Sequence, residues 1–423
     1  MLRLPEQYNY GDKHNPLLEK HNASHVLDVV GDYEHSFLGG KNLCFSLQEK
    51  EQGYRAETSY YIGIDHIGDS GKVIHVQPKL DDEERKIDYY AVLEQALSGN
   101  LKPSETKGLF EIKFNQPLIP IDQEQDYLSP LLFAQFLNLL KSIVHKGLRK
   151  SYYRVEHNMT AKVKGKILVG ATIRNNHVHG RMDRSVCSFE EYGLDHFENR
   201  LLKKALLFVS ANLHTHKTFK SLKKTVAFCR PAFTKVSETV NENQVNNFKV
   251  NPFFKEYAAA LKLAKLILKR YGFKLENATS EKVATPPFWI DMSKIFELYV
   301  YRQLEKANGI EKLLYEPVID GLRPDFLIKS NEFTGVIDAK YKPRYKTNKI
   351  DVSDFRQVLG YARMTKVYDE LEISKDSLID CLIIYSNQAE SDLKVELEKK
   401  VAEEGYVRFW KLGIKLPEIG YER

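Results

Sequence analysis

Two carboxylates and one amine lie close together in the last third of the chain, in Asp325, Asp338 and Lys340. The segments 324–328 and 334–341 that carry them are rich in strand-forming residues, and a short polar stretch separates the two, which predicts a β-hairpin. Two acids and a lysine on one patch form a minimal set for cutting a phosphodiester with a divalent metal. This segment is therefore the first candidate for an active site.

The register of the hairpin decides whether the three side chains meet. If the turn is centred between Asn331 and Glu332, Asp325 lies directly opposite Asp338, with Cβ atoms roughly 5 Å apart. Side chains alternate along a strand, so Asp338 and Lys340 share a face. The sequence thus predicts that two acids and an amine converge.

A helix expected over 291–307 precedes the hairpin and brings a third acid. Glu297 lies beside the apolar stripe of this helix, where its carboxylate could reach a metal ion. Taken alone, an exposed helical glutamate is the commoner interpretation.

A basic segment follows the hairpin directly. Its cations are Lys342, Arg344, Lys346 and Lys349. Next to a pair of carboxylates, such cations are suited to hold DNA phosphates, whereas in isolation they would form a solvated loop.

The next expected helix begins near Asp351 or Ser353, either of which can cap it, and presents Gln357 and Tyr361 at positions i and i+4. Residues at this spacing meet on one helix face. The pair could position a DNA phosphate or order Lys340; the alternative is the edge of an ordinary amphipathic helix.

The remaining composition indicates a cytoplasmic protein. With 423 residues, two or three domains are expected, and the net charge of +6 suggests a polyanionic partner. The four cysteines are far apart and form no metal or disulfide pattern, which favours a reducing compartment. No signal peptide or membrane span is expected.

Three regions are expected along the chain. Residues 1–127 are β-rich, with a hairpin formed by 60–64 and 72–76, and residues 128–280 are mainly helical. Residues 281–423 predict an α/β domain with a mixed sheet flanked by helices.

Two local predictions concern the middle region. Residues 160–173 have a strand-like pattern. Asp195 and Glu198 have the spacing of a capping box at the start of a helix.

The ordered set of candidate residues resembles the PD-(D/E)xK nuclease pattern: Pro324-Asp325, then Asp338-Ala339-Lys340, then Gln357 to Tyr361, with Glu297 on the preceding helix. Scattered signatures over nearly the whole chain are similar to McrC, the nuclease subunit of modification-dependent McrBC restriction systems. They include Ile74 to Lys79, Gly165-Lys166-Ile167 and Asn199 to Lys203.

The resemblance implies a PD-(D/E)xK domain over 281–423 that binds Mg²⁺. The ligands would be Asp325, Asp338 and the Ala339 backbone carbonyl, with Glu297 as a further or water-mediated ligand. Lys340 and Gln357 would act in catalysis. Tyr361 would join the basic segment in binding double-stranded DNA that contains methylcytosine.

The resemblance also implies a separate motor. The chain has no P-loop motif, so it is not expected to bind an NTP in that way. A McrB-like hexameric AAA+ GTPase would dock on residues 1–127 and be stimulated by them, and two nuclease domains would pair when cutting. The alternatives are a stand-alone PD-(D/E)xK endonuclease and a non-catalytic activator or scaffold of a partner NTPase.

Overall fold

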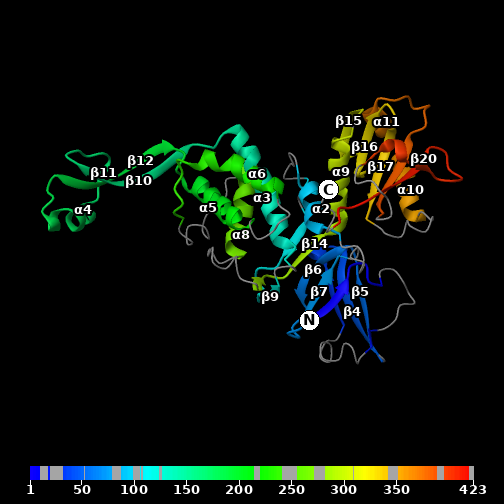
Figure 1. The fold of residues 1–423 in the computed structure, drawn as a ribbon, viewed down its shortest axis with the longest axis horizontal. Helices are drawn as coiled ribbons and strands as arrows, with labels where there is room; N and C mark the ends of the chain where they lie inside the picture. Colours follow the sequence, from blue (N-terminus) through cyan, green and yellow to red (C-terminus); the bar gives the residue numbers. More distant parts are fainter. Residues whose placement is uncertain are drawn as a thin grey trace. The chain divides into compact units, whose positions relative to one another are not determined.

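The computed structural model describes residues 1–9, 18–19, 32–51, 53–78, 87–98, 105, 108–122, 126–213, 220–240, 255–270, 282–307, 309–341, 351–387 and 395–418. The chain forms two compact units, one made of residues 1–131 and 281–423 and the other of residues 132–280. The first and last parts of the chain therefore belong to one unit (Figure 1).

Two β-sheets lie in the N-terminal part of the first unit. The strands of the larger sheet are β1 (Leu2–Pro5), β7 (Val73–Gln77), β6 (Tyr61–His66), β14 (Phe288–Asp291) and β8 (Phe110–Ile112), in this spatial order. The other sheet contains β2 (Leu18–Glu19), β5 (Gly53–Thr58), β4 (Leu43–Lys50) and β3 (Tyr33–Ser36). Strands β9 (Ile119–Asp122) and β13 (Lys282–Thr285) form a separate pair, and helix α2 covers Tyr89–Ala96.

One apolar core joins these two sheets. Phe45 from β4, Ile74 from β7 and Trp289 from β14 are all fully buried in it. The predicted hairpin is confirmed, because β6 and β7 pair antiparallel. Since β14 pairs with β6, the sheet of the first region is completed by residues beyond 281.

The last part of the chain forms a mixed sheet, as predicted, and this sheet has six strands. Its strands are β15 (Ile310–Tyr315), β16 (Phe326–Ser330), β17 (Thr334–Lys340), β18 (Asp380–Ser386), β20 (Phe409–Ile414) and β19 (Val401–Ala402), in this spatial order. Strands β17, β18 and β20 run parallel to one another, and the remaining pairs are antiparallel. The helices are α9 (Met292–Glu305), α10 (Val352–Tyr361) and α11 (Thr365–Leu371).

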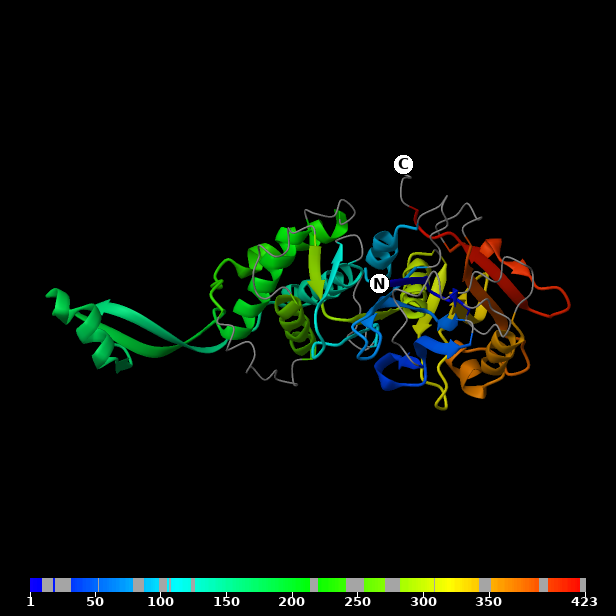
Figure 2. The same cartoon turned by 90° about the horizontal axis from the view of Figure 1, so that it is seen from below.

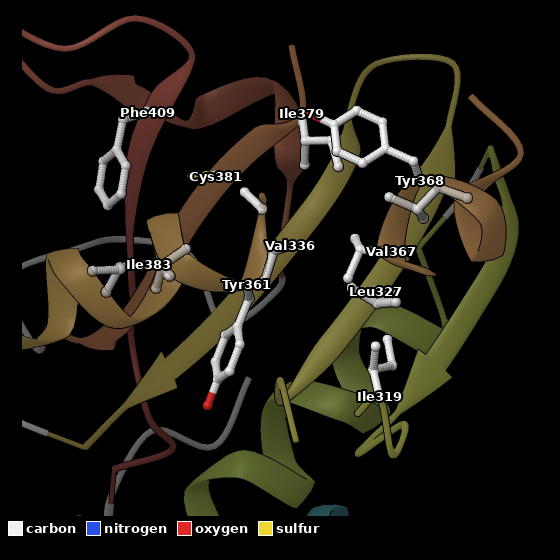
Figure 3. Packing of buried hydrophobic residues seen from close by; sticks show 13 residues of the cluster. Ile319, Leu327, Val336, Tyr361, Val367, Tyr368, Ile379, Cys381, Ile383 and Phe409 are labelled. Atoms are coloured by element: carbon white, nitrogen blue, oxygen red, sulfur yellow. The ribbon is translucent and has the colours of Figure 1, made fainter. Parts of the chain in front are cut away.

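Alternating side chains assign the helices to the two faces of this sheet. On one face Leu327 and Val336 share a core with Tyr361 of α10 and Val367 of α11 (Figure 3). On the other face the ring of Phe326 stacks with Tyr301 of α9. Side chains alternate along β17, so Asp338 and Lys340 point to the same face of the sheet as Val336. This is the face that α10 covers.

Gly335 permits the close approach of β17 to β18. A Cβ added there would lie 1.8 Å from the carbonyl oxygen of Asp380. We expect Gly335→Ala to lower the free energy of unfolding by about 3 kcal/mol, because the backbone strands must separate. Urea denaturation measures the loss. The control is Gly360→Ala on α10, where a Cβ meets nothing within 4 Å and stability should change by no more than about 1 kcal/mol. Equal stability of the two variants would contradict the expectation.

The second unit combines a helical body with a β-arm. The helices are α3 (Leu128–Lys146, which begins in the first unit), α5 (Phe197–Asn212), α6 (Lys220–Cys229) and α8 (Lys255–Arg270). The arm is a long antiparallel hairpin of β10 (Ser151–Thr160) and β12 (Arg184–Gly193), with β11 (Lys166–Ile167) and α4 (Val169–Asn175) at its far end (Figures 1 and 2). The helical prediction is confirmed for the body, and the arm is additional.

One local prediction for this unit is partly confirmed and another is wrong. The strand-like pattern of 160–173 is confirmed at Thr160, which ends β10, and at β11, but residues 169–173 lie in the helix α4. Asp195 does not cap α5: its carboxylate accepts two bonds from the Arg200 guanidinium, each at 2.8 Å, and one from the Ser237 amide at 2.7 Å. An ion pair with the nearby Arg200 and a long-range bond from Ser237 take the place of the capping interaction.

Helix α3 is long and apolar enough to cross a membrane by length and composition alone. However, 72% of its most apolar window is buried inside the protein. Such burial is typical of a core helix.

Candidate active site

The hairpin has the register that places the two acids opposite each other. Phe326 pairs with Ile337 and Lys329 with Thr334, and the next pair in this register is Asp325 with Asp338. The Ala339 amide donates a hydrogen bond of 2.8 Å to Oδ2 of Asp325. The predicted register is therefore confirmed.

Lys340 points into the space beside Asp338. Its Nζ lies 2.8 Å from Oδ2 of Asp338 and donates to Oε1 of Gln357 at 3.2 Å. The Gln357 amide nitrogen in turn donates to the Tyr361 hydroxyl at 3.1 Å. The predicted contact between Gln357 and Tyr361 is confirmed. Gln357 also accepts a hydrogen bond from Lys340, so the pair helps to position this lysine.

Burial and crowding of negative charge shape the electrostatics of the site. Asp338 is fully buried. Burial first, and then the neighbouring Asp338 carboxylate, raise the pKa of Asp325 to about 8, against the opposing effects of the Ala339 amide and Lys340. Burial alone would lower the pKa of Lys340, but Asp338 and Asp325 raise it above its ordinary value.

Glu297 lies on α9 and is partly buried, so the interpretation as an exposed helical glutamate is wrong. Burial raises its pKa well above the ordinary value, and the negative charges of Asp325 and Glu316 add to the rise. Its Oε1 atom and the Tyr315 hydroxyl are buried and make no hydrogen bond of normal geometry with the described residues, although the two groups interact electrostatically. Glu297 thus approaches Asp325 from the α9 side of the sheet.

Asp354 is a site residue that the sequence analysis missed. It lies in the first turn of α10, is 6% exposed, and its Oδ1 is 3.8 Å from Nζ of Lys340. Asp354, Gln357 and Tyr361 are at positions i, i+3 and i+7, so helical spacing would have placed this acid on the same face as the other two.

The end of β17 is also tied to the start of the chain. The Tyr341 hydroxyl donates to Oε1 of Glu6 at 2.7 Å, and the Gln7 side chain donates to the Tyr341 carbonyl at 3.1 Å. Glu6 is fully buried and Gln7 is 7% exposed. No local sequence signal predicts a contact between residues so far apart.

The basic segment that follows β17 in the sequence is predicted to hold DNA phosphates. Lys342, Arg344, Lys346 and Lys349 lie outside the residues that the structure describes. Their role in DNA binding stays a prediction.

The acidic pair fits Mg²⁺ by its chemistry. Across the described ranges, no three His, Cys, Asp or Glu side chains are placed to hold one ion together. Mg²⁺ is, however, commonly bound by one or two carboxylates, and it keeps several waters and substrate phosphate oxygens as its other ligands. Burial first, and then the charge of Asp338, raise the pKa of Asp325, and a bound cation would favour the ionised form of this acid. Ligation by the Ala339 carbonyl and by Glu297 stays a prediction.

Fold and site define a mixed α/β protein with two acids and a lysine at the end of a sheet hairpin. A family model described as "McrBC 5-methylcytosine restriction system component" matches residues 56–373, and the chain belongs to this family. The predicted resemblance is therefore confirmed. The comparison with curated proteins gives no match.

Two solved assemblies from Thermococcus gammatolerans are similar to the chain. The first is a half-complex from a tetradecameric assembly of McrB AAA+ hexamers with bound McrC. The alignment with a chain of this assembly has 16% identity and a TM-score of 0.40, and it covers 89% of the present chain and 82% of the chain in the assembly. The second is a McrBC complex with 15% identity and a TM-score of 0.30, which covers 72% of this chain and 87% of that chain.

Proposed function

We propose that this chain is the DNA endonuclease subunit of a McrBC-type restriction complex and that it hydrolyses phosphodiester bonds in methylcytosine-containing DNA with Mg²⁺. The observation that carries the proposal is the convergence of Asp325, Asp338 and Lys340 on the hairpin, with Lys340 held by Gln357. Membership of the McrBC family supports a role for this chain in a restriction system.

The positions of the side chains support the following proposed roles. Asp325 and Asp338, with the Ala339 carbonyl, would hold Mg²⁺, and Glu297 would contribute through a water molecule. When bound, the ion polarises the scissile phosphate and lowers the pKa of the attacking water. Lys340 brings a positive charge to the place where the phosphate gains negative charge, and Gln357 keeps that charge in position.

DNA would be held by cations that follow the catalytic strand. The segment of Lys342, Arg344, Lys346 and Lys349 begins two residues after Lys340 in the sequence, and cations of this kind commonly hold DNA phosphates. Tyr361 would contribute from α10. Two copies of the nuclease domain would pair to cut both strands.

A McrB-like AAA+ GTPase is the proposed motor. The sequence has no P-loop, and the similar solved assembly contains McrB hexamers with bound McrC. Residues 1–127 are the proposed docking region.

Cleavage of plasmid DNA tests this function. The full chain is mixed with its McrB-like partner, GTP and Mg²⁺, and methylated and unmethylated plasmids are compared. We expect the methylated plasmid to be cut only when partner, GTP and Mg²⁺ are all present. Cutting without the partner would instead indicate a stand-alone endonuclease. Stimulated GTP hydrolysis without any cutting would indicate a non-catalytic activator.

A further inference from the structure

The Lys340 ammonium lies between two buried acids on different elements. Oδ2 of Asp338 on β17 is 2.8 Å from Nζ, and Oδ1 of Asp354 on α10 is 3.8 Å from it. The side chains of Asp338 and Asp354 are 0% and 8% exposed, and that of Lys340 is 16% exposed. Little water is therefore available to replace either partner.

Metal binding, on the proposed function, creates a conflict at Asp338. Asp338 is a proposed ligand of the metal ion and already pairs with Lys340 through Oδ2 at 2.8 Å. Two cations held against one carboxylate repel each other strongly when water is scarce. Lys340 has a long flexible stem with rotatable donors, so its ammonium can move to another acceptor. A shift of about 1 Å would bring it to normal hydrogen-bonding distance from Asp354.

Asp354 is not required to cap its own helix. The cap of α10 is Asp351, whose Oδ1 accepts a hydrogen bond from the Ser353 amide at 2.9 Å. Gln357 lies one turn after Asp354 on the same face, so an ammonium that moves toward Asp354 stays within reach of the Gln357 side chain.

We propose that Asp354 is a positioning residue that receives the Lys340 ammonium when Mg²⁺ occupies Asp338. This inference rests on the proposed function, since it assumes that the acidic pair binds the metal. Asp354 thereby releases Asp338 for the ion and keeps Lys340 beside the phosphate instead of letting it leave the site.

The test is a calorimetric titration of the full chain with Mg²⁺ alone, which does not depend on catalysis. We expect Asp354→Asn to weaken Mg²⁺ binding about tenfold, because Lys340 then stays on Asp338 and competes with the ion. In a Lys340→Gln background, the same change at Asp354 should leave Mg²⁺ affinity unchanged. Asp354→Glu, which keeps the carboxylate, should restore most of the affinity.

Several outcomes would overturn the inference. It fails if Asp354→Asn binds Mg²⁺ as well as the wild type does, or if its loss is equally large with Lys340→Gln. If Asp354→Asn does not fold, a measurement on the wild type tests the inference instead. Addition of Mg²⁺ should shift the side-chain carboxyl ¹³C signal of Asp354 in NMR spectra. An unchanged signal overturns the inference.

The two proposals fail in different ways. A wild-type chain that neither binds Mg²⁺ nor cuts DNA removes both the nuclease function and the role of Asp354. A wild-type chain that does both, combined with an Asp354→Asn variant of unchanged Mg²⁺ affinity, removes only the role of Asp354.

Discussion

Asp338→Asn is expected to reduce DNA cleavage at least about 10³-fold. The substitution removes the buried charge that would hold the metal, and it leaves the Lys340 ammonium without the carboxylate that lies 2.8 Å away. The rate is measured in a single turnover with the McrB-like partner, GTP, Mg²⁺ and methylated plasmid. Because the amide has nearly the shape of the acid, the loss should come from chemistry rather than from a changed core.

Two controls separate this loss from a general defect. Asp376→Asn replaces an exposed acid in the loop after α11 and should cut DNA at the wild-type rate. Asp338→Asn should still stimulate GTP hydrolysis by the partner, since docking is assigned to other regions. Cleavage by Asp338→Asn at a rate close to that of the wild type would remove the acidic pair from the mechanism.

Asp325→Asn is expected to stabilise the metal-free protein at alkaline pH while abolishing cleavage. The pKa of Asp325 is about 8 in the folded protein and about 4 in an unfolded chain. Well below pH 4 the acid is neutral in both states. Between about pH 4 and pH 8 the unfolded chain ionises it more readily than the folded protein does, so folding stability is lost across this window, and the loss levels off above pH 8 where both states are ionised. The amide carries no charge and avoids the loss.

The difference should be about 5 kcal/mol in the free energy of unfolding at pH 8.5, because each unit of pKa shift corresponds to about 1.4 kcal/mol, and small at pH 4. Urea denaturation at both pH values, with EDTA present, measures it. Added Mg²⁺ should then stabilise the wild type at pH 8.5 and leave Asp325→Asn nearly unchanged. The exposed-acid variant Asp376→Asn should follow the wild type at both pH values. If Asp325→Asn were no more stable than the wild type at pH 8.5, Asp325 would not be under the electrostatic strain that a metal is proposed to relieve.

Local patterns were sufficient for the parts of the site that depend on local geometry. The register of the hairpin follows from the polar turn, and it places Asp325 opposite Asp338. The contact between Gln357 and Tyr361 follows from helical spacing. In each case the partners lie in one hairpin or on one helix, where backbone geometry alone decides which side chains meet.

Contacts between distant segments could not be obtained in this way. Tyr341 is held by Glu6 and Gln7, and Phe288–Asp291 completes a sheet whose other strands lie in the first 112 residues. The capping prediction for Asp195 is wrong because its carboxylate accepts hydrogen bonds from Arg200, which is close in the sequence, and from the distant Ser237 amide instead. Such choices depend on which surfaces pack together, and a local pattern does not contain that information.

The sequence by itself determined the chemistry of this protein: two acids and a lysine whose spacing along a hairpin makes them converge. Only the tertiary structure decided the charge environment of that trio. Packing of α10 against the sheet brings Asp354 and Gln357 to Lys340, and burial of Asp325 beside Asp338 raises the pKa of Asp325 to about 8. Spacing selects which side chains can meet, whereas the loss of water around them, which only packing produces, sets how strongly their charges interact.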